Sequence, residues 1–115
     1  MHRATRMEVS IANLKANFQA IRSHVGPGPE IFAVVKADAY GHGALKACRA
    51  FAGAGCRRYA VAIPDEALEL REGGVTEPIL VLGPTPERSA PEYVRTGITA
   101  AITDLSFAKV LSTEA

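Results

Sequence analysis

Residues 31–43 read IFAVVKADAYGHG, in which five apolar residues precede a lysine and a short segment that ends in Gly-His-Gly. The apolar run, residues 31–35, is rich in β-branched side chains and does not alternate with polar ones, which is typical of a parallel strand covered on both faces. Lys36 follows that run directly. Gly41 and Gly43 permit positive φ or a close backbone approach. The stretch therefore predicts a parallel strand that ends in a chemically unusual loop.

The strand–helix pattern recurs along the rest of the chain. Further strands are predicted at residues 59–63, 79–82 and 98–103, and helices at residues 10–24 with Ser10 as N-cap, 44–54, 64–72, 87–95 and after Asp104. One helix fits between each pair of successive strands, so the strands are expected to be parallel. The fold class is therefore α/β. We expect about four parallel β/α units preceded by one helix, the N-terminal half of a (β/α)8 TIM-type barrel.

Length and composition limit the classes of function. The 115 residues are too few for a complete eight-unit barrel, which needs roughly 200 or more. Hydrophobic residues make up 48% of the chain, enough for a packed core. The net charge of +1 gives no electrostatic reason to expect nucleic acid or an anionic membrane as a partner. No run approaches the roughly 18 apolar residues of a membrane span, and the amino terminus has no secretory signal. We expect a cytoplasmic protein.

Two other groups of residues have a structural interpretation. Cys48 and Cys56 have no His or Cys neighbours at metal-ligand spacing, so no metal site is expected and both are predicted to be buried, reduced thiols rather than a disulfide. Four charged residues of the helix at 64–72 are interpreted as a solvated face: Glu66, Glu69, Arg71 and Glu72.

The candidate chemistry lies where the first strand ends. In parallel β/α folds, sites form at the carboxyl ends of the strands. A lysine held there would be partly desolvated, which favours the neutral amine that condenses with a carbonyl. Taken alone, Lys36 more often just ends a strand and reaches water, Tyr40 is more often a packing residue, and His42 a surface residue.

The combination is more specific than its members. Residues 33–43, AVVKADAYGHG, resemble the pyridoxal-phosphate attachment signature of bacterial alanine racemases. Residues 60–74 (AVAIPDEALELREGG) and 78–83 (PILVLG) resemble the next two β/α units of that family, in the same order, and residues 7–22 resemble its first helix. The resemblance spans nearly the whole chain and loosens after Pro84.

The resemblance implies roles for four residues. Lys36 would bind pyridoxal 5′-phosphate covalently and act as acid and base on one face of the substrate Cα. Tyr40 would donate a hydrogen bond to the cofactor phosphate. Val34 and Leu82 would pack against the pyridine ring. Asp38 stands where family members carry Asn or Asp.

The resemblance also implies an activity, the interconversion of L- and D-alanine that supplies D-alanine for peptidoglycan, in an enzyme that is a homodimer at full length. The family's opposite-face tyrosine, later phosphate-binding segments and C-terminal β domain have no counterpart here. We therefore expect residues 1–115 to be the N-terminal part of the barrel domain and, alone, to be inactive as a racemase. Two alternatives stay open. One is another amino acid racemase, for serine or of broad specificity, or a decarboxylase on the same barrel, against which Tyr40 to Gly43 argues. The other is a non-catalytic cofactor-binding fragment, whose half barrel would leave inner apolar residues uncovered.

Overall fold

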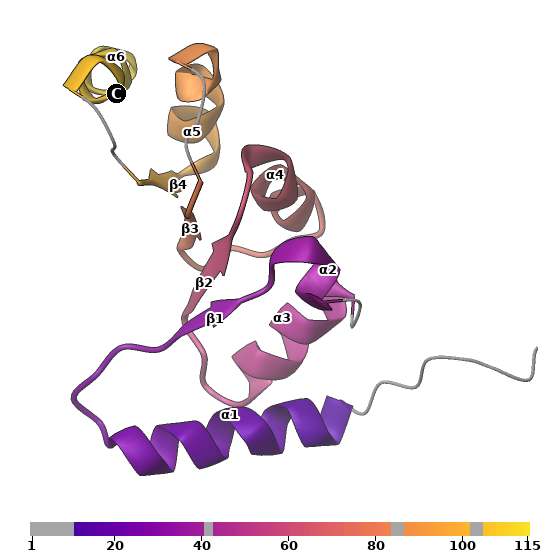
Figure 1. The fold of residues 1–115 in the computed structure, drawn as a ribbon. Helices are drawn as coiled ribbons and strands as arrows, with labels where there is room; N and C mark the ends of the chain where they lie inside the picture. The colour runs from indigo at the N-terminus through magenta and orange to yellow at the C-terminus, as the bar shows by residue number, and fades with distance from the viewer. Residues whose placement is uncertain (1–10, 41–42, 84–86, 102–104) are drawn as a thin grey trace, which may run out of the picture.

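The computed structural model describes residues 11–40, 43–83, 87–101 and 105–115. Its four strands form one parallel sheet in the order β1 (Phe32–Val34), β2 (Arg58–Val61), β3 (Ile79–Val81) and β4 (Ile98–Ala100). In the register of the sheet, Ala60 pairs with Val34 on one side and with Leu80 on the other. Each strand lies beside the next one along the chain (Figure 1), so the predicted α/β architecture of successive parallel units is confirmed.

The helices follow the predicted pattern, with one addition. They are α1 (Ile11–Val25), α2 (Lys36–Tyr40), α3 (Ala44–Gly53), α4 (Pro64–Glu72), α5 (Ala90–Thr96) and α6 (Leu105–Glu114). The helix expected at residues 87–95 begins as a separate 3-10 turn, Glu87–Ser89. The caps expected at Ser10 and Asp104 lie outside the described residues. α2 was not predicted. Across the described ranges, none of these helices is long and apolar enough to cross a membrane.

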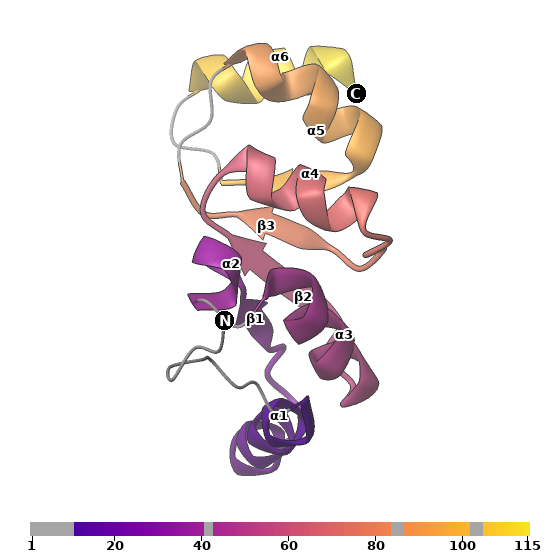
Figure 2. The same cartoon turned by 90° about the vertical axis from the view of Figure 1, so that its right-hand side faces the viewer.

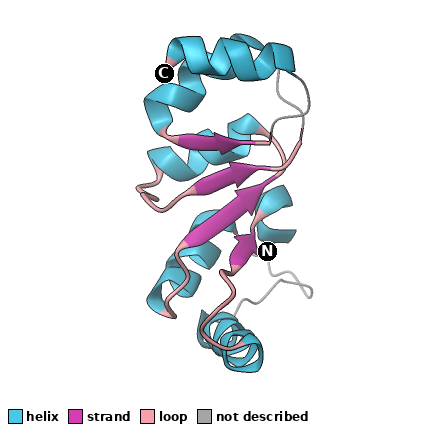
Figure 3. Cartoon of the chain, turned by 90° about the vertical axis from the view of Figure 1, so that its left-hand side faces the viewer, coloured by secondary structure: helices cyan, strands magenta, loops and turns pink. Residues whose placement is uncertain are grey.

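The two faces of the sheet differ in their cover. Figure 2 shows α3, α4 and α5 lying over one face, where Tyr59, Val61 and Val81 are fully buried. Figure 3 shows the strands from the other side, where no described helix covers them. On this open face Phe32 is 43% exposed and Val34 is 40% exposed. The expectation of cover on both faces of β1 is thus wrong within the described chain, whereas uncovered inner residues are what a half barrel predicts.

The two cysteines lie on the helix-covered side of the sheet. Cys48 and Cys56 are buried and free, which confirms the prediction of buried thiols. The Tyr59 hydroxyl donates a hydrogen bond of 2.8 Å to the carbonyl of Cys48 and so ties β2 to α3. Burial raises the pKa of the Cys48 thiol from 9.0 to about 12, and burial likewise raises the pKa of Cys56.

We expect both thiols to resist labelling in the folded protein. At pH 8 a thiol with a pKa of about 12 is ionised about 1000-fold less than an ordinary one, and the thiolate is the reactive form. A chromogenic disulfide reagent should therefore label both cysteines slowly in buffer and rapidly in denaturant. Rapid labelling of either thiol without denaturant would contradict the packing described.

Arg71, at the end of α4, is a structural residue. Its guanidinium donates hydrogen bonds to the carbonyls of Thr96 at 2.7 Å, Val75 at 2.9 Å and Glu77 at 2.7 Å, and to that of Gly97 at 3.2 Å. It thus joins α4 to the segments that lead into β3 and β4. Burial lowers the pKa of this guanidinium. The interpretation of Arg71 as part of a solvated face is wrong, although Glu69 and Glu72 are exposed as expected.

Candidate functional site

Lys36 lies just beyond the carboxyl end of β1, as the first residue of α2. The β1–β2 ladder continues one residue beyond the strand, because the Val35 amide donates a 2.9 Å bond to the Ala60 carbonyl. Val35 is buried, whereas Val34, on the open face of the sheet, is 40% exposed. Lys36 is half-buried.

Leu82 lies at the same end of the sheet as Lys36. Val34 is paired with Ala60, and Val61 with Val81. Leu82 directly follows β3, and its amide donates to the Val61 carbonyl at 2.8 Å, while Lys36 lies two residues beyond Val34. Leu82 is 46% exposed and Val34 is 40% exposed, so two uncovered apolar side chains lie at the end of the sheet that Lys36 follows.

The chain turns left-handed immediately after Lys36. Ala37, Asp38 and Ala39 have φ values of 51°, 55° and 55°, a conformation that costs a residue with a Cβ about 1–2 kcal/mol. The sequence pointed to the glycines of this segment for positive φ, and Gly43 does adopt it, at 89°. Three further left-handed residues without glycine were not expected.

Hydrogen bonds from both sides hold this turn. The Ala37 amide donates to Glu66 Oε2 at 2.6 Å. At the other end, Asp38 Oδ1 accepts from the Ala44 amide at 2.8 Å, and the Asp38 carbonyl accepts from the Gly43 amide at 2.9 Å. Asp38 thereby satisfies the first amide of α3. The backbone that follows Lys36 is therefore fixed by side chains rather than left as an open loop.

Glu66 connects the ends of two strands. Its Oε1 accepts from the amides of Ala62 at 2.8 Å and Ile63 at 3.2 Å, at the start of α4. Its Oε2 accepts from Ala37, after β1. The side chain is half-buried. The interpretation of Glu66 as a solvated residue is wrong. The sequence indicated only the bonds to Ala62 and Ile63, because an acid three residues after a helix boundary often accepts from the amides there. It did not indicate the bond to Ala37.

A close backbone approach completes this edge of the sheet. The Gly83 amide donates to the Ala62 carbonyl at 3.0 Å, and a Cβ on Gly83 would lie 2.6 Å from that same oxygen. Glycine is therefore required at this position next to Leu82.

We expect Gly83→Ala to destabilise the protein by about 1–3 kcal/mol, as overpacking against rigid backbone does. The β2 and β3 ends would have to separate to admit the methyl group. Urea unfolding measures the change. Gly28→Ala is the matched control, because nothing lies within 4 Å of the added Cβ there. Equal midpoints for the two variants would show that the approach is not tight.

Tyr40 is the last residue of α2, and its side chain lies outside the described residues, as do Gly41 and His42. The structure thus brings Lys36, Val34 and Leu82 to the same end of the sheet. An amine beside uncovered apolar side chains, on a backbone held by Glu66, fits a covalently bound aromatic aldehyde. Within the described ranges no three His, Cys, Asp or Glu side chains gather to hold a metal ion.

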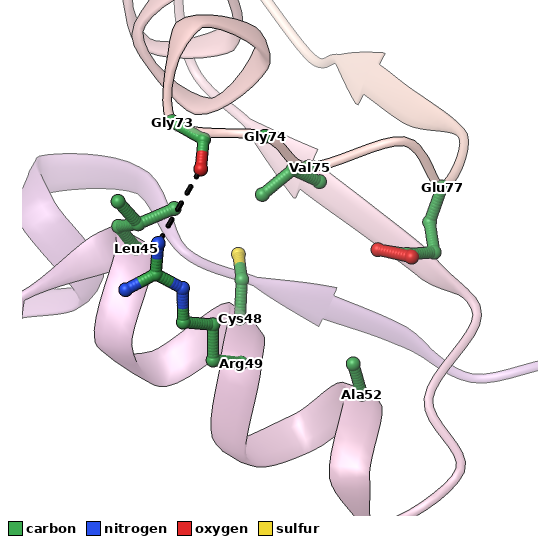
Figure 4. Close-up of a pocket in the computed structure, with 8 residues that line it drawn as sticks. All are labelled: Leu45, Cys48, Arg49, Ala52, Gly73, Gly74, Val75 and Glu77. Atoms are coloured by element: carbon green, nitrogen blue, oxygen red, sulfur yellow. Dashed lines mark hydrogen bonds between the residues drawn. The ribbon is translucent and has the colours of Figure 1, made fainter.

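Two hollows of the described surface lie away from Lys36. Figure 4 shows one of about 80 Å³ between α3 and the turn after α4, lined by Leu45, Cys48, Arg49, Ala52, Gly73, Gly74, Val75 and Glu77. Across it, Arg49 donates a long 3.5 Å bond to the Gly73 carbonyl. A larger hollow, of about 620 Å³, lies at the amino ends of the strands and includes Arg58 and Thr99. Neither of these two hollows includes Lys36.

Known proteins share this sequence and fold. The family described as "Alanine racemase, N-terminal domain" matches residues 9–115. "Alanine racemase 2" of Caldanaerobacter subterraneus subsp. tengcongensis is 43% identical over 109 residues, 95% of this chain and 28% of that protein. Alanine racemase from E. faecalis superposes with a TM-score of 0.90 at 32% identity, covering 98% of this chain and 30% of that one. The histidine racemase of Leuconostoc mesenteroides subsp. sake superposes with a TM-score of 0.82 at 33% identity, covering 90% of this chain and 28% of that one.

The chain thus spans under a third of the length of these relatives. Its four β/α units correspond to the N-terminal barrel portion of the alanine racemase structures, as the half-barrel prediction requires.

Proposed function

The chain belongs to the alanine racemase N-terminal domain family, and from that membership we propose that it supplies the cofactor-lysine part of a pyridoxal-5′-phosphate-dependent alanine racemase. The observation that carries this proposal is the position of Lys36. It stands inside AVVKADAYGHG, at the carboxyl end of β1, on a turn held by Glu66 and Asp38. Rigid placement at a strand end is what an attachment lysine needs.

Four side chains would divide the work. Lys36 would hold the cofactor covalently through Nζ and would take and return the proton at the substrate Cα. Val34 and Leu82, which are 40% and 46% exposed, would pack against the pyridine ring. Tyr40 would donate a hydrogen bond to the phosphate. When bound, pyridoxal phosphate supplies an electron sink that makes the Cα proton acidic.

The wider biology is part of the same proposal. Residues 1–115 form the N-terminal part of the barrel domain, the substrate is alanine, and the product D-alanine serves peptidoglycan synthesis. The active enzyme is a homodimer in the cytoplasm. The two free, buried thiols are compatible with a reducing compartment.

Hydrogen exchange at the substrate tests this proposal. With pyridoxal phosphate and alanine in D₂O, the protein should exchange the α-hydrogen of one alanine enantiomer, because that step needs only the base on one face. Serine and histidine serve as comparison substrates. Faster exchange of serine or histidine would show that this amino acid, and not alanine, is the substrate. No exchange with any amino acid would overturn the proposal.

A further inference from the structure

The peptide bond between Lys36 and Ala37 is held by a residue from another β/α unit. Its N–H is the Ala37 amide, which donates to Glu66 Oε2 at 2.6 Å. Glu66 lies 29 positions away, in the first turn of α4. The bond therefore fixes the peptide plane that adjoins the Lys36 Cα, from which the side chain departs.

The turn needs such an external hold. Ala37, Asp38 and Ala39 all occupy the left-handed region, and residues in that region persist only where surrounding structure determines them. Asp38 secures the far end through the Ala44 amide. At the near end, beside Lys36, the Ala39 amide donates to the Val35 carbonyl at 3.0 Å, and Glu66 supplies a contact from outside the segment.

Glu66 is suited to this task by its charge and by its second oxygen. Oε1 is committed to the amides of Ala62 and Ile63, which anchors the side chain to the start of α4. An anion at that end of a helix is favoured by the helix dipole. Only a carboxylate offers acceptors to both strand ends at once, because an amide side chain would turn its NH₂ toward one of the N–H groups.

We propose that Glu66 is the positioning residue for Lys36: by holding the Lys36–Ala37 peptide against the end of β2, it orients the lysine toward the aldehyde of the cofactor. This role rests on the proposed function. It assigns Glu66 no contact with cofactor or substrate. The step that it assists is the condensation in which Lys36 Nζ bonds to the aldehyde carbon and water leaves.

Glu66→Gln is the most direct variant. The glutamine oxygen can replace Oε1 at Ala62 and Ile63, while its NH₂ faces the Ala37 N–H, donor against donor. A hydrogen bond to a charged group is worth ~10–100-fold in an equilibrium, so amide exchange at Ala37 should accelerate by that factor in the cofactor-free protein. The rate of pyridoxal phosphate attachment, followed by visible absorbance, should fall ~10–100-fold as Lys36 is misplaced.

A second variant of Glu66 and a matched control complete the test. Glu66→Asp retains the charge at the start of α4 but is shorter by one carbon–carbon bond of about 1.5 Å, so it should slow attachment in the same way. Glu69→Gln makes the same chemical change at an exposed position of the same helix and should alter neither rate. Far-UV circular dichroism and urea unfolding establish that each variant is folded.

The outcomes separate the two proposals. Slower attachment together with faster Ala37 exchange in both Glu66 variants supports the positioning role. Attachment at the unaltered rate in Glu66→Gln overturns it while the proposed function stands. No attachment to Lys36 in the unmodified protein overturns the proposed function, and the positioning role falls with it.

Discussion

Lys36→Ala should abolish both covalent attachment of pyridoxal phosphate and α-hydrogen exchange of alanine. The variant removes the amine that binds the cofactor and the base that moves the proton, so a loss of at least ~1000-fold is expected. Visible absorbance of the protein–cofactor mixture and proton NMR of alanine in D₂O measure the two effects.

Lys46→Ala is the matched control for that result. Lys46 lies on α3, and its side chain is exposed, so its removal should leave attachment and exchange unchanged. Attachment that persists in Lys36→Ala and disappears in Lys46→Ala would move the site to α3 and contradict the strand-end assignment.

Arg71→Ala should lower the free energy of unfolding by about 3 kcal/mol, because four backbone carbonyls lose a charged donor. The loss loosens the junction of α4 with the segments before β3 and β4. Urea unfolding measures it. The effect should be on stability alone, since Arg71 lies at the far end of α4 from Glu66.

Arg95→Ala provides the comparison for Arg71. Arg95 pairs with Glu92 on the exposed surface of α5, and such pairs contribute about 0–1 kcal/mol. Equal unfolding midpoints for the two variants would show that the four hydrogen bonds of Arg71 do not hold the units together.

The helices and strands could be predicted because their positions follow from the pattern of apolar residues, prolines and glycines within each segment. The apolar spacing of residues 10–24 gave α1 almost to the residue, and the apolar run at 31–35 gave β1, which the structure places at Phe32–Val34. Pro64 and the glycines at 73 and 74 bounded α4 at Pro64–Glu72. In each case neighbouring residues carry the information.

The turn after Lys36 and the role of Glu66 could not be predicted in the same way. Alanine has no preference for left-handed φ, so Ala37 and Ala39 adopt it because of bonds formed across the fold. Glu66 and Arg71 looked like surface charges since their distant partners, backbone groups 29 and 25 positions away, leave no trace in the local sequence. The positions of Lys36 and Leu82 just beyond strand ends were nevertheless predicted correctly, because strand ends follow from the apolar runs.

Where the cofactor attaches can be read from a peptide map. The protein is incubated with pyridoxal phosphate, reduced with borohydride to fix the cofactor on its amine, digested, and examined by mass spectrometry. We predict a pyridoxyl mass increment on the peptide that contains Lys36, and on no other. An increment confined to Lys15, Lys46 or Lys109, or no increment at all, would contradict the assignment of Lys36 as the attachment lysine.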